Sequence, residues 1–166
     1  MDFTRNVYPD AAEAIWAGEP EYSATEAYPD EEFLRVLQSA SEQLAMSPPA
    51  VLRRFGSFAA EVTFRSLYPN FYEECTGTRQ FLLEVEGRIH RLVRATIPHA
   101  SPPKLHVVPL GAAGVTVTYT SERGLCDLVD GLIRGTARHY HERYTVDQVQ
   151  CMQRGDSACA FTVEPA

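Results

Sequence analysis

Apolar residues recur every three to four positions through the N-terminal half of the chain, which is the pattern of amphipathic helices. This pattern predicts helices over about residues 10–17, 30–44, 48–66 and 78–97. Asp10 is the expected cap of the first helix, and Trp16 is its expected apolar anchor. Ser47 followed by Pro48 marks the start of the third, because serine caps helices and proline suits their first turn.

The pattern changes after the proline pair Pro102-Pro103, which ends regular helix. Val115, Val117 and Tyr119 alternate with threonines, and this period of two is typical of a strand. Strands are expected over about 105–108, 115–119, 144–151 and 158–164, with a helix over about 125–142 inserted between the two pairs. Helices followed by strands indicate an α+β fold: a helical N-terminal half, then an antiparallel sheet of about four strands with an inserted helix.

Composition and charge narrow the class of protein. The chain has 166 residues, and this length predicts a single domain over 1–166. Apolar residues make up 45% and charged residues 22%, which excludes a largely disordered chain. No apolar run reaches the ~20 residues of a membrane span, and no secretory signal opens the chain, so a cytoplasmic location is expected. The net charge of −7 argues against a nonspecific nucleic-acid binder.

Tyr119, Ser121 and Arg123 form the first candidate site. Residues two apart in an extended segment share a face, so two hydroxyls and a guanidinium would point the same way. Such a row suits carboxylates or phosphates, because arginine offers two parallel donors. The alternative is a polar strand face that runs into a turn.

His90 is the second candidate, because it lies in the most apolar helix of the chain. An imidazole nitrogen is a good iron ligand, and a helix holds it rigidly. Gly87, one turn earlier, would leave room for a flat group beside the helix. The alternative is a histidine at the core boundary that binds a backbone carbonyl, and the other four histidines fit this alternative better.

The third candidate is a set of cysteines. Cys151 and Cys159 flank a turn at Gly155-Asp156, so a hairpin can bring their thiols together, and Cys126 could join them from the preceding helix. Thiolates are good zinc ligands, but this spacing matches no common zinc signature. The alternative is that the three are small buried apolar side chains. Cys75 is unrelated to them in the sequence.

The order of these features resembles the heme nitric oxide/oxygen binding (H-NOX) family, which includes relatives of the sensor domain of soluble guanylate cyclase. A helical histidine, a Pro-Pro pair twelve residues later and a Tyr-x-Ser-x-Arg motif follow one another in the family's register over residues 25–164. The resemblance implies that His90 binds heme iron, that Pro103 presses on the porphyrin, and that Tyr119, Ser121 and Arg123 bind the propionates. Three further segments resemble the family's distal half: Tyr28-Pro29-Asp30, Phe55-Gly56 and Tyr68-Pro69.

The family function is then expected here: a heme b gas sensor and not an enzyme. Family members that hold oxygen carry a distal tyrosine where this chain has Leu128, so we expect nitric oxide, and carbon monoxide, to bind in preference to oxygen. Nitric oxide weakens the bond to a trans ligand, so it would release His90 and free the helix over about 78–97. The signal would pass to a separate protein, by family analogy a histidine kinase or a cyclic-dinucleotide enzyme.

Two departures from the family are visible. The segment 1–24 is a shortened counterpart of the family's N-terminal helix. In one H-NOX subgroup four thiolates bind zinc, and this chain has Gln148 where the fourth is expected beside Cys126, Cys151 and Cys159; His141 is an alternative ligand. The C-terminal end also resembles 4-vinyl reductase domains, so the alternative function is a heme-free module that binds an apolar small molecule or a partner protein.

Overall fold

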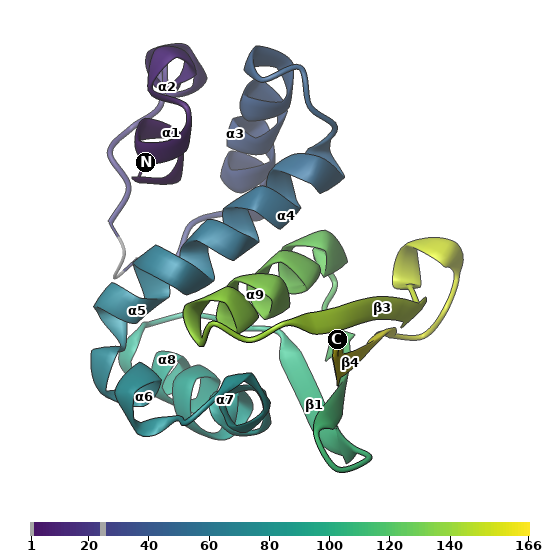
Figure 1. Ribbon diagram of the computed structural model, residues 1–166. Coiled ribbons are helices and arrows are strands. Elements are labelled where there is room, and N and C mark those ends of the chain that lie inside the picture. Colours follow the sequence, from purple (N-terminus) through teal and green to yellow (C-terminus); the bar gives the residue numbers. More distant parts are fainter. Residues whose placement is uncertain (1, 24–25) are drawn as a thin grey trace.

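The helices and strands of the computed structural model, which describes residues 2–23 and 26–166, confirm the expected α+β class. Figure 1 shows α1, α2 and α3 at one end of the molecule and α6, α7 and α8 at the other. The α4 and α9 helices cross the middle, with the sheet against α9. Among the described residues no helix is long and apolar enough to cross a bilayer.

The N-terminal end of the molecule is a small helical lobe. It comprises α1 (Asp2–Val7), α2 (Pro9–Ile15) and α3 (Asp30–Gln43), which pack on α4 around Ile15, Ala40 and Val51. Trp16 anchors this lobe as expected, and its Nε1 donates to Thr4 Oγ1 at 2.6 Å. Asp10 is not the helix cap: α2 begins at Pro9, so Tyr8 holds the cap position and Asp10 lies in the first turn.

The helix expected over 48–66 is interrupted. It is built of α4 (Pro48–Phe58), a π-helical turn (Ala59–Thr63) and α5 (Phe64–Leu67). Ser47 holds the N-cap position, but its side chain makes no capping hydrogen bond. After the break at Tyr68, a short helix, α6 (Pro69–Glu74), was not expected from the sequence.

The apolar helix that carries His90 also contains a π-helical turn. It runs as α7 (Thr78–Val85), the turn Glu86–His90 and α8 (Arg91–Thr96), after which Pro98 prevents continuation. Such turns frequently occur at functional sites in proteins. His90 therefore stands at the end of the widened turn, where the helix changes its hydrogen-bonding pattern.

The sheet has the order β1-β2-β4-β3, and every neighbouring pair is antiparallel. Its strands are β1 (Lys104–Leu110), β2 (Gly114–Thr120), β3 (Tyr144–Gln150) and β4 (Cys159–Pro165). The inward face of β2 and β4 forms the centre of the larger core, with Val115, Val117, Phe161 and Val163 almost fully buried. The inserted helix α9 (Cys126–His139) ends three residues earlier than the expected 142.

Glycines allow α4 and α9 to cross at close range. A methyl group at Gly131 would lie 2.3 Å from the Arg53 carbonyl oxygen, and one at Gly135 would lie 2.4 Å from that of Ser57. Gly56 on α4 faces the Leu128 carbonyl oxygen in the same way, at 2.5 Å. The N-terminal lobe is therefore joined to the sheet half through a helix crossing that has no room for side chains.

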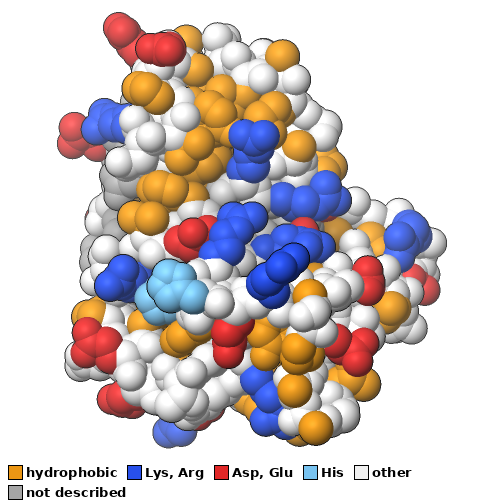
Figure 2. All heavy atoms as spheres, in the orientation of Figure 1, with side chains coloured by type: hydrophobic (Ala, Val, Ile, Leu, Met, Phe, Trp, Pro, Cys, Tyr) orange, Lys and Arg blue, Asp and Glu red, His pale blue; other side chains and the backbone are white. Residues whose placement is uncertain are grey.

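Arginines cover the outside of this crossing. Figure 2 shows Lys and Arg side chains gathered in the middle of one face, over α4 and α9. Arg53, Arg54, Arg134 and Arg138 line a hollow of about 530 Å³ there. Three of them pair with carboxylates of α9 and of the π-helical turn: Asp127, Asp130 and Glu61. The pairs of Arg53 tie α4 to α9 at the surface, and the Arg138–Glu61 pair ties α9 to the π-helical turn.

Candidate functional site

A cavity of about 570 Å³ lies between the N-terminal lobe and the sheet half. Helices α3 and α4 contribute one wall; α8, the turn after it and the start of α9 contribute the other. The lining is mainly apolar, and its members include Phe33, Val36, Leu52, Phe55, Val93, Ile97, Leu125 and Leu128. A volume of this size is typical of small-molecule and cofactor sites.

Arg123 brings a positive charge to this cavity. It lies in the turn between β2 and α9, its side chain is 42% exposed, and it lines the cavity. Its Nε donates to Asp30 Oδ1 at 2.7 Å, so it joins this turn to the first residue of α3. The guanidinium can therefore reach an anionic group at the cavity edge.

Tyr119, Ser121 and Arg123 do not form the expected row on one strand face. Strand β2 ends at Thr120, and the turn that follows is closed by bonds from Gly124 N–H to the Ser121 carbonyl and from Arg123 N–H to Ser121 Oγ. Tyr119 is buried in the core, and its hydroxyl accepts from the Leu125 N–H at 3.1 Å. Burial raises the pKa of Tyr119 above its usual value, although the hydrogen bond with the Ser121 side chain opposes this rise. The Tyr119 and Ser121 side chains therefore meet at this turn, and the Arg123 guanidinium extends instead to Asp30.

His90 is held by a carboxylate on its own helix. Its Nδ1 lies 2.7 Å from Glu86 Oε2, and its side chain is 16% exposed. Donation from Nδ1 to a carboxylate leaves Nε2 as the unprotonated nitrogen that can bind a metal. His90 itself is not among the residues that line the cavity, but Val93 and Ile97 are. His90 lies three residues before Val93 and seven before Ile97. The three side chains therefore share one helix face, with His90 one turn nearer the N-terminus.

Glu86 is fixed by two further contacts. Its Oε1 accepts from Arg94 Nη2 at 2.7 Å, and its Oε2 accepts from the Leu105 N–H at 3.3 Å. Burial raises the pKa of Glu86, but the hydrogen bonds from Arg94 and His90 outweigh it and hold the pKa below its usual value. Glu86 is therefore a carboxylate that orients His90 against β1, and its position four residues before His90 on a helix is the sequence signal for this pair.

A second histidine, His99, lines the cavity directly. It is exposed and has a left-handed backbone conformation, φ 62°, in the turn after α8. From the sequence it was grouped with the histidines that fit the core-boundary alternative better than iron binding, because it lies in a loop. Of the remaining expected residues, Leu128 and Pro102 line the cavity, and Pro103 is half-buried at the start of β1. Gly87 is exposed, with nothing within 4 Å of a methyl group placed there, and it is not among the residues that line the cavity.

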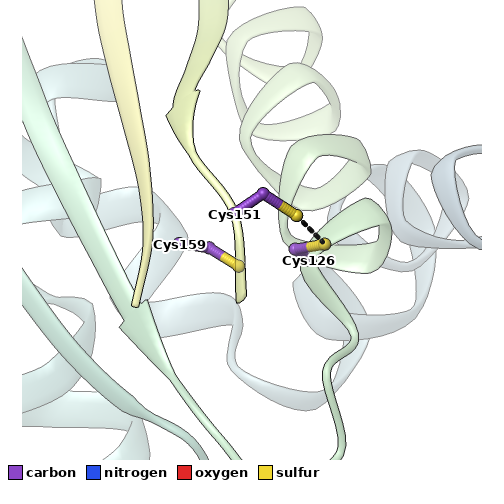
Figure 3. A group of neighbouring side chains, drawn as sticks. All are labelled: Cys126, Cys151 and Cys159. Atoms are coloured by element: carbon purple, nitrogen blue, oxygen red, sulfur yellow. Dashed lines mark hydrogen bonds between the residues drawn. The ribbon is translucent and has the colours of Figure 1, made fainter. Parts of the chain in front are cut away.

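The three cysteines come together away from the cavity lining. Figure 3 shows Cys126 at the start of α9 and Cys151 and Cys159 where β3 and β4 approach it. Their sulfur atoms lie within 4.8 Å of one another, with 3.8 Å between those of Cys126 and Cys151. Burial raises the pKa of the Cys126 thiol to about 12. His141 is wrong as a further ligand, because it lies beyond the opposite end of α9, about 20 Å from Cys126.

Comparison with known proteins places the chain in one family. The model of the Haem-NO-binding family matches residues 5–148. An H-NOX protein of Shewanella oneidensis in the Fe(II)NO state has a TM-score of 0.89 at 19% identity, covering 99% of this chain and 94% of that one. The same protein's domain in the Fe(II)CO state has a TM-score of 0.84 at 22% identity, with 93% and 87% covered.

An unliganded Fe(II) H-NOX variant from K. algicida is also similar, with a TM-score of 0.79 at 21% identity and coverage of 99% and 91%. No curated protein matches this chain. These identities show a shared fold, and the family model covers most of the chain. On the fold, the cavity and this match, the chain belongs to the Haem-NO-binding (H-NOX) family of heme-binding domains.

Proposed function

We propose that this chain is a single-domain, heme-based sensor of nitric oxide, which also accepts carbon monoxide. The observation that carries the proposal is the apolar cavity between the lobes, with Arg123 at its edge and the Glu86–His90 pair on the adjoining helix face. Apolar walls, one neutral imidazole nitrogen and a cation for carboxylates are what a heme requires. We infer a binding protein and not an enzyme, acting in the cytoplasm.

The residues present fit a heme. The cavity lining is apolar where a porphyrin would lie, and its charged and polar groups gather near Arg123 and Asp30, where propionates would lie. Arg123 and the Ser121 hydroxyl would bind the propionates, and Tyr119, whose hydroxyl is occupied by Leu125, would hold the turn beside them. His90 would bind the iron through Nε2, and Pro103 would press on the porphyrin.

The chemistry of the sensor follows from Leu128 and His90. His90 would hold the heme iron, and the bound heme would supply a site for a diatomic gas. Leu128, which lines the cavity, offers no hydrogen-bond donor to a gas, so bound oxygen would gain no stabilisation from it. Release of His90 on nitric oxide binding would free the π-helical turn Glu86–His90 and the helix around it.

The freed helix would pass the signal to a separate protein. A histidine kinase or a cyclic-dinucleotide enzyme is the kind of partner we propose. The zinc that the resemblance implies is not part of the proposed function. Its three thiolates would come from Cys126, Cys151 and Cys159, and a closed tetrahedral zinc site needs a fourth ligand.

The test is heme uptake by matched histidine variants. Protein expressed with added heme precursor should carry heme and show a Soret band. His90→Gly should lose heme, and imidazole in the buffer should restore the band by supplying the missing ligand. His99→Gly is the control, because His99 lines the cavity without the helical anchor and the carboxylate partner of His90.

A Soret band that survives His90→Gly unchanged but disappears in His99→Gly would move the iron ligand to His99. A colourless protein that also refuses added hemin would overturn the heme proposal. In that case the cavity belongs to a heme-free module that binds an apolar small molecule or a partner protein.

A further inference from the structure

The cysteine cluster is a preassembled site with three sulfur ligands. Cys126, Cys151 and Cys159 are buried, at 2%, 5% and 0% relative exposure, and their sulfur atoms lie within 4.8 Å of one another. Three separate elements deliver them: the first turn of α9, the residue after β3 and the first residue of β4. Figure 3 shows their side chains converging from these elements. The fold therefore places the thiols within reach of one common atom.

No fourth ligand completes this site. Among the described residues, the group of close His, Cys, Asp and Glu side chains contains these three alone. Gln148, the position at which a fourth thiolate is expected from the resemblance, has a buried amide beside Cys126, and its side-chain hydrogen bond opposes the rise in the Cys126 pKa. The NH₂ group of an amide donates hydrogen bonds, and its nitrogen does not bind metals. The set therefore does not fit the closed four-ligand zinc site of structural zinc proteins.

The charge of the site narrows the choice of ion further. Three thiolates carry three negative charges. A divalent ion would leave a buried net charge of −1, and a monovalent ion would leave −2. The Met152 N–H that donates to Cys159 Sγ at 3.3 Å is uncharged, and the Asp156 carboxylate that accepts from the Cys151 N–H at 2.7 Å is itself an anion, so neither compensates a negative charge. An uncompensated charge in such surroundings is costly. A trivalent ion makes the site neutral.

We propose that Cys126, Cys151 and Cys159 form a binding site for a trivalent, thiophilic ion with three-coordinate geometry, of which arsenic(III) is the type. Soft thiolates favour soft ions, and arsenic(III) takes three sulfur ligands in a pyramid with its lone pair on the open side. No fourth ligand is then needed, and the open side can face apolar neighbours.

Binding is a ligand exchange without redox chemistry. Arsenous acid, As(OH)₃, is neutral and reacts with three thiols: three As–O bonds break, three As–S bonds form, and each thiol proton leaves with a hydroxide as water. Arsenic stays trivalent and sulfur stays reduced. Entry is through the turn over 152–158, where Gly155 takes a left-handed conformation, φ 97°, and the residues from Gln153 to Ser157 are exposed.

The experiment is arsenite titration of the reduced, full-length protein. Binding is followed by the near-ultraviolet absorption of As–S bonds, and the bound metal is counted after gel filtration. We expect one arsenic per chain with three sulfur neighbours in X-ray absorption. Cys126→Ser, Cys151→Ser and Cys159→Ser should each lose this binding, and Cys75→Ser, at the buried cysteine outside the cluster, should keep it.

Circular dichroism of every variant separates loss of binding from loss of the fold. Arsenic that survives any of the three cluster substitutions with three sulfur neighbours would overturn the proposal. So would protein that is isolated with one tightly held zinc and does not exchange it for arsenic. Neither result bears on the heme, because the readouts need no heme and the cysteines do not line the heme cavity.

Discussion

Glu86 and His90 are the residue pair on which the proposed sensor chemistry rests. The Nδ1–Oε2 distance of 2.7 Å and the second anchor of Glu86 on Arg94 fix the ring before any ligand binds. A carboxylate partner raises the basicity of a histidine ligand and so strengthens its bond to a metal. On the proposed function, Glu86 would therefore set, from one helical turn away, the strength of the iron–His90 bond that nitric oxide must break.

Glu86→Gln tests this influence. The amide keeps the shape and a hydrogen bond but removes the charge, so we expect a weaker iron–histidine bond and a lower iron–histidine stretching frequency in the resonance Raman spectrum of the ferrous protein. Glu84→Gln is the matched control, because Glu84 binds Gln80 and Arg88 on the same helix and does not touch His90. Equal frequencies in both variants and the parent would exclude a tuning role for Glu86.

Leu128 is the residue that we expect to set the discrimination against oxygen. Leu128→Tyr places a hydroxyl in the cavity, and a hydrogen bond to a polar bound gas is worth about 1–2 kcal/mol, or roughly tenfold in affinity. Oxygen affinity of the ferrous protein should rise by that order in Leu128→Tyr but not in Leu128→Phe, which has the ring without the donor. Tight oxygen binding by the parent protein would contradict the assignment.

At the scale of elements, the crossing of α4 and α9 carries the connection between the two halves. Its glycines are in van der Waals contact with the opposite backbone, and ion pairs of Arg53 and Arg138 span the outside. Motion that starts in the helix of His90 can reach the N-terminal lobe through the cavity walls or through this crossing. The crossing is closely packed, so we expect the walls of the cavity to move.

Gly131→Ala should destabilise this crossing. The added methyl would lie 2.3 Å from the Arg53 carbonyl oxygen, and forced repacking of this kind costs about 1–3 kcal/mol. Gly87→Ala is the control in another helix: nothing lies within 4 Å, so the gain in helix propensity should stabilise the protein by up to about 1 kcal/mol. Urea unfolding of the heme-free proteins measures both, and equal stabilities would show that α4 and α9 separate at little cost.

The elements themselves were predictable where the hydrophobic pattern is long. The helix over 30–44 and the four strands are found within a few residues of their expected ends, because each buries one face over several turns or pleats. Helices α1 and α6 were missed, since six residues are too few to establish a period. The two π-helical turns leave no trace in the apolar spacing, and the end of β2 at Thr120 was masked by the continuing polar alternation.

The residues of the candidate site could be predicted from the sequence better than their arrangement in space. His90, Arg123 and Leu128 were identified from their spacing and family resemblance, and two of these line the cavity. Glu86 was passed over although it lies four residues before His90 on the same helix, and His99 was missed because its place at the cavity depends on the turn after Pro98. The convergence of three cysteines was expected from the hairpin, and only the fold could show that His141 is distant.

At the scale of the whole molecule, the cavity lies at the boundary between two lobes. Its walls come from the N-terminal lobe on one side and from α8, the turn of Arg123 and α9 on the other. The ion pair of Arg123 and Asp30 crosses this boundary, with 2.7 Å between Nε and Oδ1. A ligand that fills the cavity must therefore bind both lobes at once, which is the arrangement by which occupancy can alter their relative positions.

Arg123→Ala should weaken the retention of heme. Loss of a partly exposed charge–charge contact is worth about 1 kcal/mol, so transfer of heme to apomyoglobin should be accelerated several-fold. Arg35→Ala is the control, because Arg35 pairs with Glu19 inside the N-terminal lobe and does not line the cavity. Equal transfer rates in the two variants would remove Arg123 from the propionate site.

Addition of nitric oxide to the ferrous protein tests the central claim, that this chain is a sensor whose signal is the release of His90. The account predicts a Soret band that shifts to the position of a five-coordinate nitrosyl heme, with the iron–histidine stretch lost from the resonance Raman spectrum. A stable six-coordinate nitrosyl spectrum that keeps the histidine bond would contradict it, because His90 and its π-helical turn would then stay in place whatever gas is bound.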